Sequence, residues 1–265
     1  MTIAGGERYQ RCWQDVARPT WAEYAGRHGH DIVVIRAPID PSAKARSRSI
    51  AWQKCLIPSL AWAKSYERLC WIDADILINP EAPDIFTACP AEAIGATFVH
   101  DQLSPAEKHV LLERVHRRSF GEAEVPGAWA TTQNGLYRDA GIETSDVDMV
   151  QTGVLVFSPH RDETVFSAAY RRERDTVAYE QPSLSHEILR SGRLHRMSAR
   201  WNWGLYDAIA LHHQAFLKPN DEISGTIAEF GAIASRELQN AYFLHFYRLF
   251  GIMEILRPTA VRQKG

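Results

Sequence analysis

The chain has 265 residues, of which 45% are hydrophobic and 23% charged, and its formal net charge at pH 7 is −2. This composition is typical of a globular domain and excludes fibrous, disordered and disulfide-scaffold proteins. The near-neutral charge gives no general attraction to nucleic acid, and the absence of any run of 18 apolar residues argues against a membrane span. The four cysteines form no CxxC pair and no secretory signal precedes them, which indicates reduced thiols in a cytoplasmic protein.

The first hundred residues alternate short apolar runs with segments of helical periodicity. Short apolar runs bounded by Gly or polar residues are typical of buried strands. We predict, in chain order, a strand over 2–4 ending at Gly5-Gly6, helical segments over 7–28 broken at Pro19, a strand over 31–36, a helix over 47–64 broken near Pro58, and strands over 68–73 and 93–98.

The remaining residues continue this alternation. We predict a helix over 105–118, a loop over 121–146, a strand over 149–157, helices over 161–174 and 181–191, and an aromatic strand over 241–246. Strands that alternate with helices indicate an α/β fold, with a mainly parallel central sheet flanked by helices in a single domain over 1–265. Ligands of such sheets bind at the carboxyl ends of strands. That rule directs attention to Gly5-Gly6, Asp73 to Asp75, His100-Asp101 and His245.

Two carboxylates, Asp73 and Asp75, interrupt an otherwise apolar stretch. Carboxylates held so close together repel one another unless a proton or a cation lies between them, and a hard divalent ion is the simplest partner. The alternative is a strand-end turn in which one acid caps the next helix. A second acid pair, Asp146 and Asp148, lies in a polar loop before a strand, and we interpret it as structural.

The segment 66–79, YERLCWIDADILIN, resembles the metal-binding segment of GT-A nucleotide-sugar glycosyltransferases, most closely the retaining group of glycogenin and the bacterial α-galactosyltransferases. Segments similar to the family's hydrophobic strand, acid-Gln donor-sugar motif, acceptor-side loop and histidine strand follow in the family's order, at 148–157, 179–182, 200–203 and 244–246. The resemblance implies a GT-A fold with a nucleotide-binding half over 1–100 and a sugar and acceptor half over 101–265.

By this resemblance, Asp73, Asp75 and His245 hold one Mn²⁺ or Mg²⁺ ion. Such an ion bridges the two phosphates of the donor and stabilises charge on the departing nucleotide. For His245, within Tyr-Phe-Leu-His-Phe, the alternative is a core histidine of an aromatic cluster.

The resemblance places the nucleoside on the end of the first strand and the residues after it: Ala4, Gly5, Gly6 and Tyr9. Small residues permit close backbone approach to a base, and a tyrosine ring can stack on uracil. A plain turn at Gly5-Gly6 is the alternative. The other implied donor-binding positions are Lys54, with Arg48 as a neighbouring candidate, and Asp73, Ala74, Gln151, Gly153 and Arg248.

Glu180 and Gln181 match the acid-Gln motif, with a Glu where the family has Asp. The resemblance implies that Glu180 accepts hydrogen bonds from donor-sugar hydroxyls and that Gln181 lies beneath the anomeric carbon. A helix start before Pro182 is an alternative, compatible reading. Two departures stand out: Gln-Thr-Gly at 151–153 replaces Asn-Ala-Gly, and the family's closing Gly-x-x-Lys-Pro-Trp is absent, which leaves Arg248 as the nearby cation.

Together these motifs indicate a metal-dependent glycosyltransferase that transfers a hexose from a nucleoside diphosphate sugar, most simply a UDP-sugar, to a hydroxyl of a small-molecule or glycan acceptor, with retention. No acid stands out as a dedicated base, although an inverting base could come from Asp101, Asp139 or Asp207. One alternative is a sugar-1-phosphate nucleotidyltransferase, which needs a Gly-rich basic loop after the first strand. Another is a non-catalytic nucleotide-sugar-binding relative.

Overall fold

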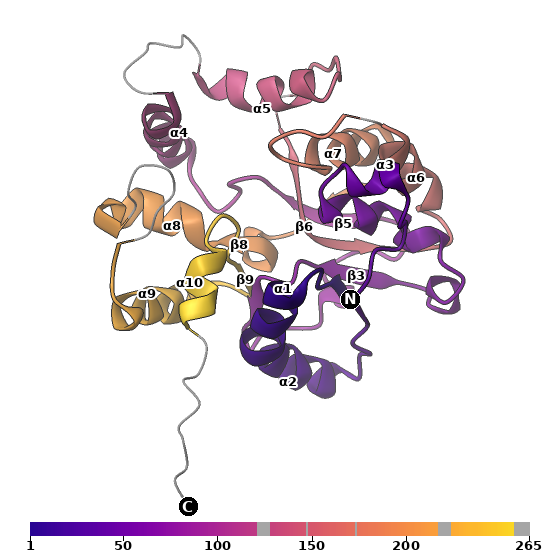
Figure 1. Ribbon diagram of the computed structural model, residues 1–265, viewed down its shortest axis with the longest axis horizontal. Helices are drawn as coiled ribbons and strands as arrows, with labels where there is room; N and C mark the ends of the chain where they lie inside the picture. The colour runs from indigo at the N-terminus through magenta and orange to yellow at the C-terminus, as the bar shows by residue number, and fades with distance from the viewer. Residues whose placement is uncertain (121–127, 147, 173, 217–223, 257–265) are drawn as a thin grey trace, which may run out of the picture.

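The computed structural model describes residues 1–120, 128–146, 148–172, 174–216 and 224–256 (Figure 1). It is an α/β structure in which a central sheet lies between helices. No helix in the described ranges combines the length and apolarity needed to cross a bilayer.

The central sheet contains four strands in the order β3-β6-β5-β7. Their bounds are Leu69–Ile72, Val150–Phe157, Ile94–Phe98 and Leu194–Arg196. The parallel pair β1 (Thr2–Ile3) and β2 (Val34–Ile35) extends this sheet beside β3. The backbone N–H of Ile72 donates to the carbonyl of Met1 at 2.9 Å, and the Met1 amino group donates to the carbonyl of Cys70 at 2.7 Å.

A smaller sheet of three strands lies at the end of β3, in the order β4-β9-β8. Its strands span Ile76–Ile78, Phe243–His245 and Trp203–Gly204. Because β3 and β4 are separated by only three residues, Asp73 to Asp75 form the junction between the two sheets. The register pairs Ile76 with His245, so the C-terminal strand ends beside this junction.

The sheets are mixed, so the predicted parallel character is only partly present. Within the described residues, β1–β2, β5–β7 and β8–β9 pair in parallel, whereas β3–β6, β5–β6 and β4–β9 are antiparallel. The long strand β6 runs against both of its neighbours, because it starts at the end of the sheet where β5 finishes, with Val150 paired to Phe98. An apolar run does not carry strand direction, so composition gave no signal for this reversal.

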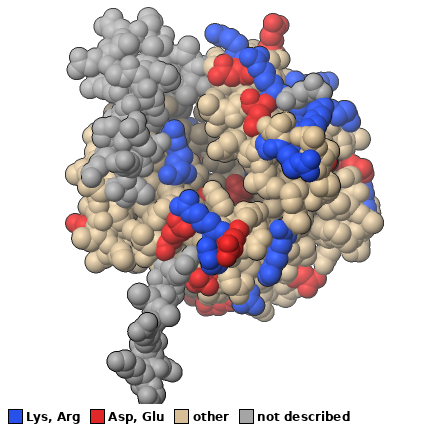
Figure 2. Space-filling model, viewed as in Figure 1, with Lys and Arg blue, Asp and Glu red and all other residues tan. Residues whose placement is uncertain are grey.

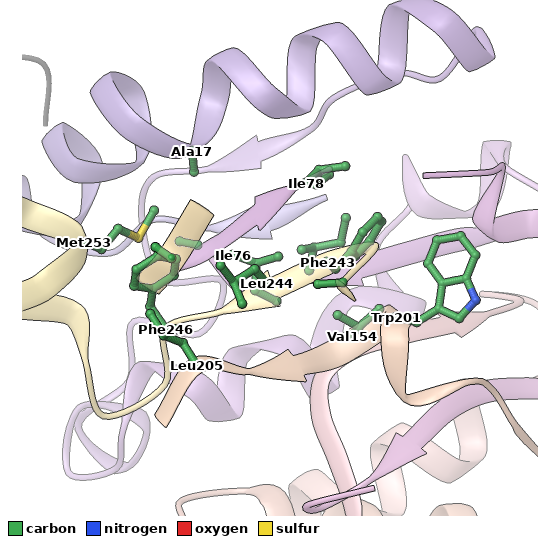
Figure 3. Close-up of a cluster of buried hydrophobic side chains, with 14 of the residues drawn as sticks. Ala17, Ile76, Ile78, Val154, Trp201, Leu205, Phe243, Leu244, Phe246 and Met253 are labelled. Atoms are coloured by element: carbon green, nitrogen blue, oxygen red, sulfur yellow. The ribbon is translucent and has the colours of Figure 1, made fainter. Parts of the chain in front are cut away.

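Side-chain alternation divides the core into two layers, one on each face of the central sheet. Leu69 and Trp71 of β3 pack with the α6 and α7 side of the sheet, and Cys70 and Ile72 pack with the opposite side. Figure 3 shows the opposite layer, where buried side chains of β4 and β9 meet those of the helices: Ala17, Ile76, Ile78, Phe243, Leu244, Phe246 and Met253. Strand β3 is therefore packed on both faces along its whole length.

The α-helices are α1 Glu7–Cys12, α2 Arg18–His28, α3 Ala43–Arg46, α4 Pro105–Phe120, α5 Ala128–Asp139, α6 Glu163–Arg171, α7 Gln181–Arg190, α8 Leu205–His212, α9 Ile227–Asn240 and α10 Phe250–Ile255. A π-helical turn, Trp13–Ala17, joins α1 to α2. The 3₁₀ segments are Ile50–Ser59, Ala63–Ser65, Ile85–Thr87, Ala199–Asn202 and Gln214–Phe216.

Three local predictions need correction. The predicted break at Pro19 is a π-helical turn just before it, and Pro19 occupies the first turn of α2, where its missing N–H costs nothing. The helix expected over 47–64 is two 3₁₀ segments, the first of which contains Pro58. The loop expected over 121–146 contains helix α5, whose Tyr137 packs with Ile142 and Met149; residues 121–127 lie outside the described ranges.

Candidate functional site

The ends of the central strands surround one large cavity of about 1460 Å³. Figure 2 shows a hollow near the middle of this face, with acidic atoms recessed inside it. Its lining includes eleven of the residues predicted to form the site: Gly5, Tyr9, Lys54, Asp73, Ala74, Asp75, Gln151, Glu180, Gln181, His245 and Arg248. Residues far apart in the chain, from the end of β1 to the segment after β9, are therefore brought to one place.

Three predicted residues do not line this cavity. Ala4 lines a smaller cavity of about 430 Å³ beside α1. Gly6 is exposed and begins α1 with a φ of 82°, a backbone conformation that favours glycine, so the turn interpretation accounts for it. Gly153 lies in β6 behind the carboxylates, where its role is steric.

Asp73, Asp75 and His245 form one cluster at the junction of the two sheets. Each offers a ligand atom, and these atoms all lie within 4.8 Å of one another. Nε2 of His245 is 3.3 Å from Oδ1 of Asp75 and 3.8 Å from Oδ2 of Asp73. Two carboxylates and one imidazole are ligands that suit Mn²⁺ and also bind Mg²⁺.

The orientation of His245 is set by its surroundings. Its Nδ1 lies 2.8 Å from the amide oxygen Oδ1 of Asn202, which can only accept, so Nδ1 carries a proton and Nε2 faces the carboxylates, with a lone pair for a metal in the neutral form of the imidazole. A Cβ on Gly153 would come within 2.4 Å of Cε1 of His245. Glycine at this position is therefore required for the imidazole to reach the carboxylates. The backbone N–H of Asp73 donates to the carbonyl of Gly153 at 2.8 Å, which locks the acid to the same strand.

Burial and neighbouring charges shift the pKa values of the cluster in opposite directions. Burial raises the pKa of Asp73 above its ordinary value, against the opposing influence of Lys54 and His245. Burial also acts to raise the pKa of Asp75, but the adjacent His245 outweighs it, and the pKa is lowered. For His245, burial acts to lower the pKa, yet Asp75 and Asp73 outweigh it and the pKa is raised. The cluster thus favours a positive charge between its carboxylates.

Lys54 joins the cluster of Asp73, Asp75 and His245 to the acid-Gln motif. It is 2% exposed, and its Nζ lies 3.1 Å from Oδ1 of Asp73 and 2.8 Å from Oε1 of Glu180. Nζ also donates to the carbonyl of Thr152 at 3.1 Å. Burial acts to lower the pKa of Lys54, but Asp73 and Glu180 outweigh it and raise it, so the lysine stays charged. Two carboxylates thus share one ammonium, and Asp75 adds a third acid beside them, which leaves a negative cluster suited to a divalent cation.

Glu180 and Gln181 occupy the start of α7, as the helix-start alternative predicts, and the donor-sugar interpretation is compatible with this position. Glu180 is the N-cap residue and Pro182 follows in the first turn. The hydroxyl of Thr152 donates to Oε1 of Glu180 at 2.8 Å, the same oxygen that Lys54 contacts. Among the described residues, nothing hydrogen-bonds Oε2 of Glu180, and Gln181 lines the cavity beside it.

The two predicted arginines differ in their surroundings. Arg48 lies between the rings of Trp52 and Tyr170 and donates to the carbonyl of Tyr170 at 3.1 Å, so it supports the fold rather than the cavity. Arg248 lines the cavity over the ring of Tyr206, 5.1 Å from its centroid.

Of the three candidate bases, Asp139 lines the cavity wall, whereas Asp101 and Asp207 have close partners. Asp101 forms an ion pair with Arg196. Asp207 binds both His100 and Tyr247.

Three side chains at the site were not among the predicted binding residues. Trp71 donates from Nε1 to Oδ1 of Asp73 at 2.7 Å, and the i, i+2 spacing along β3 could have indicated that the two share a face. Asn202 supports His245 from an adjacent segment, and no sequence spacing connects the two. Tyr247 lines the cavity two residues after His245, and its pKa is raised well above the ordinary value by burial and by Asp207.

Neither a known protein-family profile nor a curated protein sequence matches the chain. Among solved structures, it is similar to the apo structure of WbbM, a bifunctional glycosyltransferase, with 14% identity and a TM-score of 0.53 over 96% of this chain and 50% of that one. It is also similar to a glycosyltransferase involved in glycosylation of the major capsid of PBCV-1, with 13% identity and a TM-score of 0.51 over 96% of this chain and 98% of that one. The chain spans half the length of the WbbM chain, and its fold is that of a GT-A-like glycosyltransferase.

Proposed function

We propose that the protein is a metal-dependent glycosyltransferase that transfers a hexose from a nucleoside diphosphate sugar, most simply a UDP-sugar, to an acceptor hydroxyl. The observation that carries the proposal is the cluster of Asp73, Asp75 and His245 on the wall of a cavity of about 1460 Å³. A fold shared with glycosyltransferases supports the class of reaction. In this proposal, residues 1–100 bind the nucleotide and residues 101–265 bind the sugar and the acceptor.

The donor set fits a hard divalent cation. Two carboxylates and the lone pair of Nε2 converge within 4.8 Å, and Asn202 holds His245 in the tautomer that a metal ligand needs. When bound there, Mn²⁺ or Mg²⁺ would neutralise the donor diphosphate and the charge that develops on the departing nucleotide. Asp73, Asp75 and His245 would hold it.

The remaining residues would bind and orient the donor. Tyr9 stacks on Phe250 with ring centroids 4.1 Å apart and is 44% exposed, so its ring can take a nucleobase on its open side. Gly5 lets the backbone approach the nucleoside, and Ala74 and Gln151 line the floor between the acids and the sugar. Arg248 would contact the diphosphate in place of the family's missing lysine.

Glu180 and Gln181 would act on the sugar. Since Oε1 of Glu180 is bound by Lys54 and Thr152, Oε2 is the oxygen available to accept hydrogen bonds from sugar hydroxyls. The amide oxygen of Gln181 would lie beneath the anomeric carbon and stabilise the positive charge that develops there. We propose retention, in which the leaving phosphate takes the proton of the acceptor hydroxyl on the same face of the sugar.

A nucleotidyltransferase is less well supported. That reaction needs a basic phosphate-binding loop after the first strand, and the basic residue there, Arg8, forms an ion pair with Glu254 and lies over the ring of Phe250. Calorimetric titration of UDP into the protein, with Mn²⁺ and again with EDTA, tests the proposed function. We expect UDP to bind with micromolar affinity when Mn²⁺ is present and not when EDTA removes it. Equal binding of UDP in EDTA would contradict the metal site.

A further inference from the structure

A second polar cluster lines the same cavity, outside the proposed donor and metal site. Nδ1 of His100 lies 2.8 Å from Oδ2 of Asp207, and the hydroxyl of Tyr247 donates to Oδ1 of the same carboxylate. His100 follows β5, Asp207 lies in the first turn of α8, and Tyr247 follows β9. His100 and Tyr247 line the cavity, while the carboxylate between them is 1% exposed.

A buried carboxylate needs donors on both oxygens, and here both donors come from the cavity wall. Because a carboxylate can only accept, Nδ1 of His100 carries the proton in this bond. The imidazole is thereby fixed in one plane, and in its neutral form Nε2 is a hydrogen-bond acceptor. Asp207 is therefore a positioning residue, which sets the orientation of two side chains at the cavity surface.

The backbone around this cluster is built to hold it. His100 has a φ of 57°, in the left-handed region that few residues other than glycine adopt. A Cβ on Gly204 would come within 2.6 Å of the Tyr247 ring, so only glycine leaves room for that ring. Gln102 fixes Gly204 with two hydrogen bonds of 2.7 Å, one to its carbonyl and one from its N–H. Such support is typical of a preorganised binding site.

Aromatic rings lie beside the polar cluster and connect it to the metal ligands. The rings of Tyr206 and Tyr247 both line the cavity, with centroids 5.8 Å apart. The Tyr247 ring lies 5.3 Å from that of His245, so the second cluster adjoins the first. An aromatic face next to a fixed hydrogen-bonding imidazole matches a pyranose, which has an apolar face and a rim of hydroxyls.

We propose that His100, Asp207 and Tyr247 form the acceptor site, and that the acceptor is a carbohydrate. The imidazole of His100 hydrogen-bonds one acceptor hydroxyl, the Tyr247 ring packs against the apolar face of the sugar, and Asp207 holds both in place. This inference rests on the proposed function, since it names the acceptor class of the same cavity. Residues scattered at 100, 207 and 247 thus form one site that no sequence motif describes.

The test is saturation-transfer NMR with the whole protein, UDP and Mg²⁺, titrated with methyl α- and β-glycosides of glucose, galactose and mannose. We expect at least one glycoside to bind the wild type, and His100→Ala to weaken that binding about tenfold or more. His100→Gln should recover part of the affinity, because its side chain amide can again hydrogen-bond a hydroxyl. His212→Ala, an exposed histidine on α8, is the matched control and should bind as the wild type does.

Affinity for UDP separates this inference from the proposed function. His100→Ala and Asp207→Asn should keep wild-type affinity for UDP and Mg²⁺ while the Kd for the methyl glycoside rises, since no hydrogen bond or ion pair within the described residues joins either one to Asp73, Asp75 or His245. If the wild type binds no nucleoside diphosphate in a metal-dependent way, the proposed function fails and the acceptor site fails with it. If UDP binds but no glycoside does, or if His100→Ala binds glycosides as tightly as the wild type, the acceptor site alone is overturned.

Discussion

The two walls of the cavity are built in different ways. On one wall, Asp73 and Asp75 come from a single short segment, and buried Lys54 ties them to Glu180. On the other, His100 and Tyr247 meet on the carboxylate of Asp207, and these three residues are more than a hundred positions apart at the extremes. The first wall depends on charge in a buried network, and the second depends on backbone geometry. Substitutions in the first wall should therefore change metal affinity and stability, whereas substitutions in the second wall should change the binding of the acceptor.

The largest expected effect is on the cluster of Asp73, Asp75 and His245. Asp75→Asn removes one of the two carboxylates that we propose as metal ligands, and we expect Mn²⁺-dependent UDP binding to be lost in calorimetry. The matched control is Asp148→Asn, the exposed acid of the second pair, which should bind UDP as the wild type does. Unchanged Mn²⁺ affinity in Asp75→Asn would show that the cluster is not the metal site.

Lys54→Met should reveal how much the first wall depends on buried charge. It leaves the carboxylates of Asp73 and Glu180 without their shared ammonium, and we expect the free energy of unfolding to fall by about 3–5 kcal/mol in urea denaturation. Lys64→Met is the control: its ion pair with Glu163 is partly exposed and should contribute about 0–1 kcal/mol. Equal losses in the two variants would contradict the buried network.

Gly153→Ala tests the steric requirement behind the cluster. The new Cβ would lie 2.4 Å from Cε1 of His245, so the imidazole must move away from the carboxylates. We expect Mn²⁺ affinity to fall about 10–100-fold, similar to the effect of losing an outer-shell partner. Gly26→Ala, in a helix where a Cβ would meet nothing within 4 Å, should leave Mn²⁺ affinity unchanged.

Asn202→Ala should have a smaller effect on the same cluster. It removes the acceptor that holds Nδ1 of His245, and we expect about a tenfold loss of Mn²⁺ affinity with little change in the acceptor-side wall. Asn202→Asp keeps an acceptor at this position and should retain more affinity than Asn202→Ala. The reverse order would exclude a role for Asn202 in orienting the imidazole.

Near neutral pH, the smallest effect is the dependence of Mn²⁺ affinity on pH. Asp75 and Asp73 raise the pKa of His245 above 6.5 against the effect of burial, and a protonated imidazole cannot bind a metal. Mn²⁺ affinity should therefore decrease as the pH falls, beginning above pH 6.5 and approaching about tenfold per pH unit once His245 is protonated. Asp75→Asn should bind too weakly to show this slope. A flat affinity across this range would mean that His245 is not a ligand.

Local sequence pattern was enough to predict the parts of the fold that depend on burial. The apolar runs that became β3, β5, β6 and β9 lie within the predicted ranges, because a strand buried on both faces must be apolar throughout. Strand direction was less predictable, since β6 runs against β3 and β5. Helix α5 contains Thr, Asn and Gly, which disfavour helices, and its Tyr137 packs with Ile142 and Met149.

The same division applies to the site. Asp73 and Asp75 were predictable because acids in an apolar run are costly to bury without a purpose. Lys54 lines the cavity, but its contact with Glu180 is a tertiary one, and no spacing could indicate it. His100 stood at a predicted strand end, yet its partner Asp207 lies 107 positions away. The sequence was enough to single out candidate site residues, whereas the side chains that they contact could be identified only from the fold.

The most direct test of the account is calorimetric titration of UDP into the wild-type protein, with Mn²⁺ and again with EDTA. We expect micromolar binding that requires the metal and disappears in Asp75→Asn. Metal-dependent binding of a different nucleoside diphosphate would keep the site and change the donor. If no nucleoside diphosphate binds in a metal-dependent way, Asp73, Asp75 and His245 are not a donor site, and the likeness to glycosyltransferases is one of fold alone.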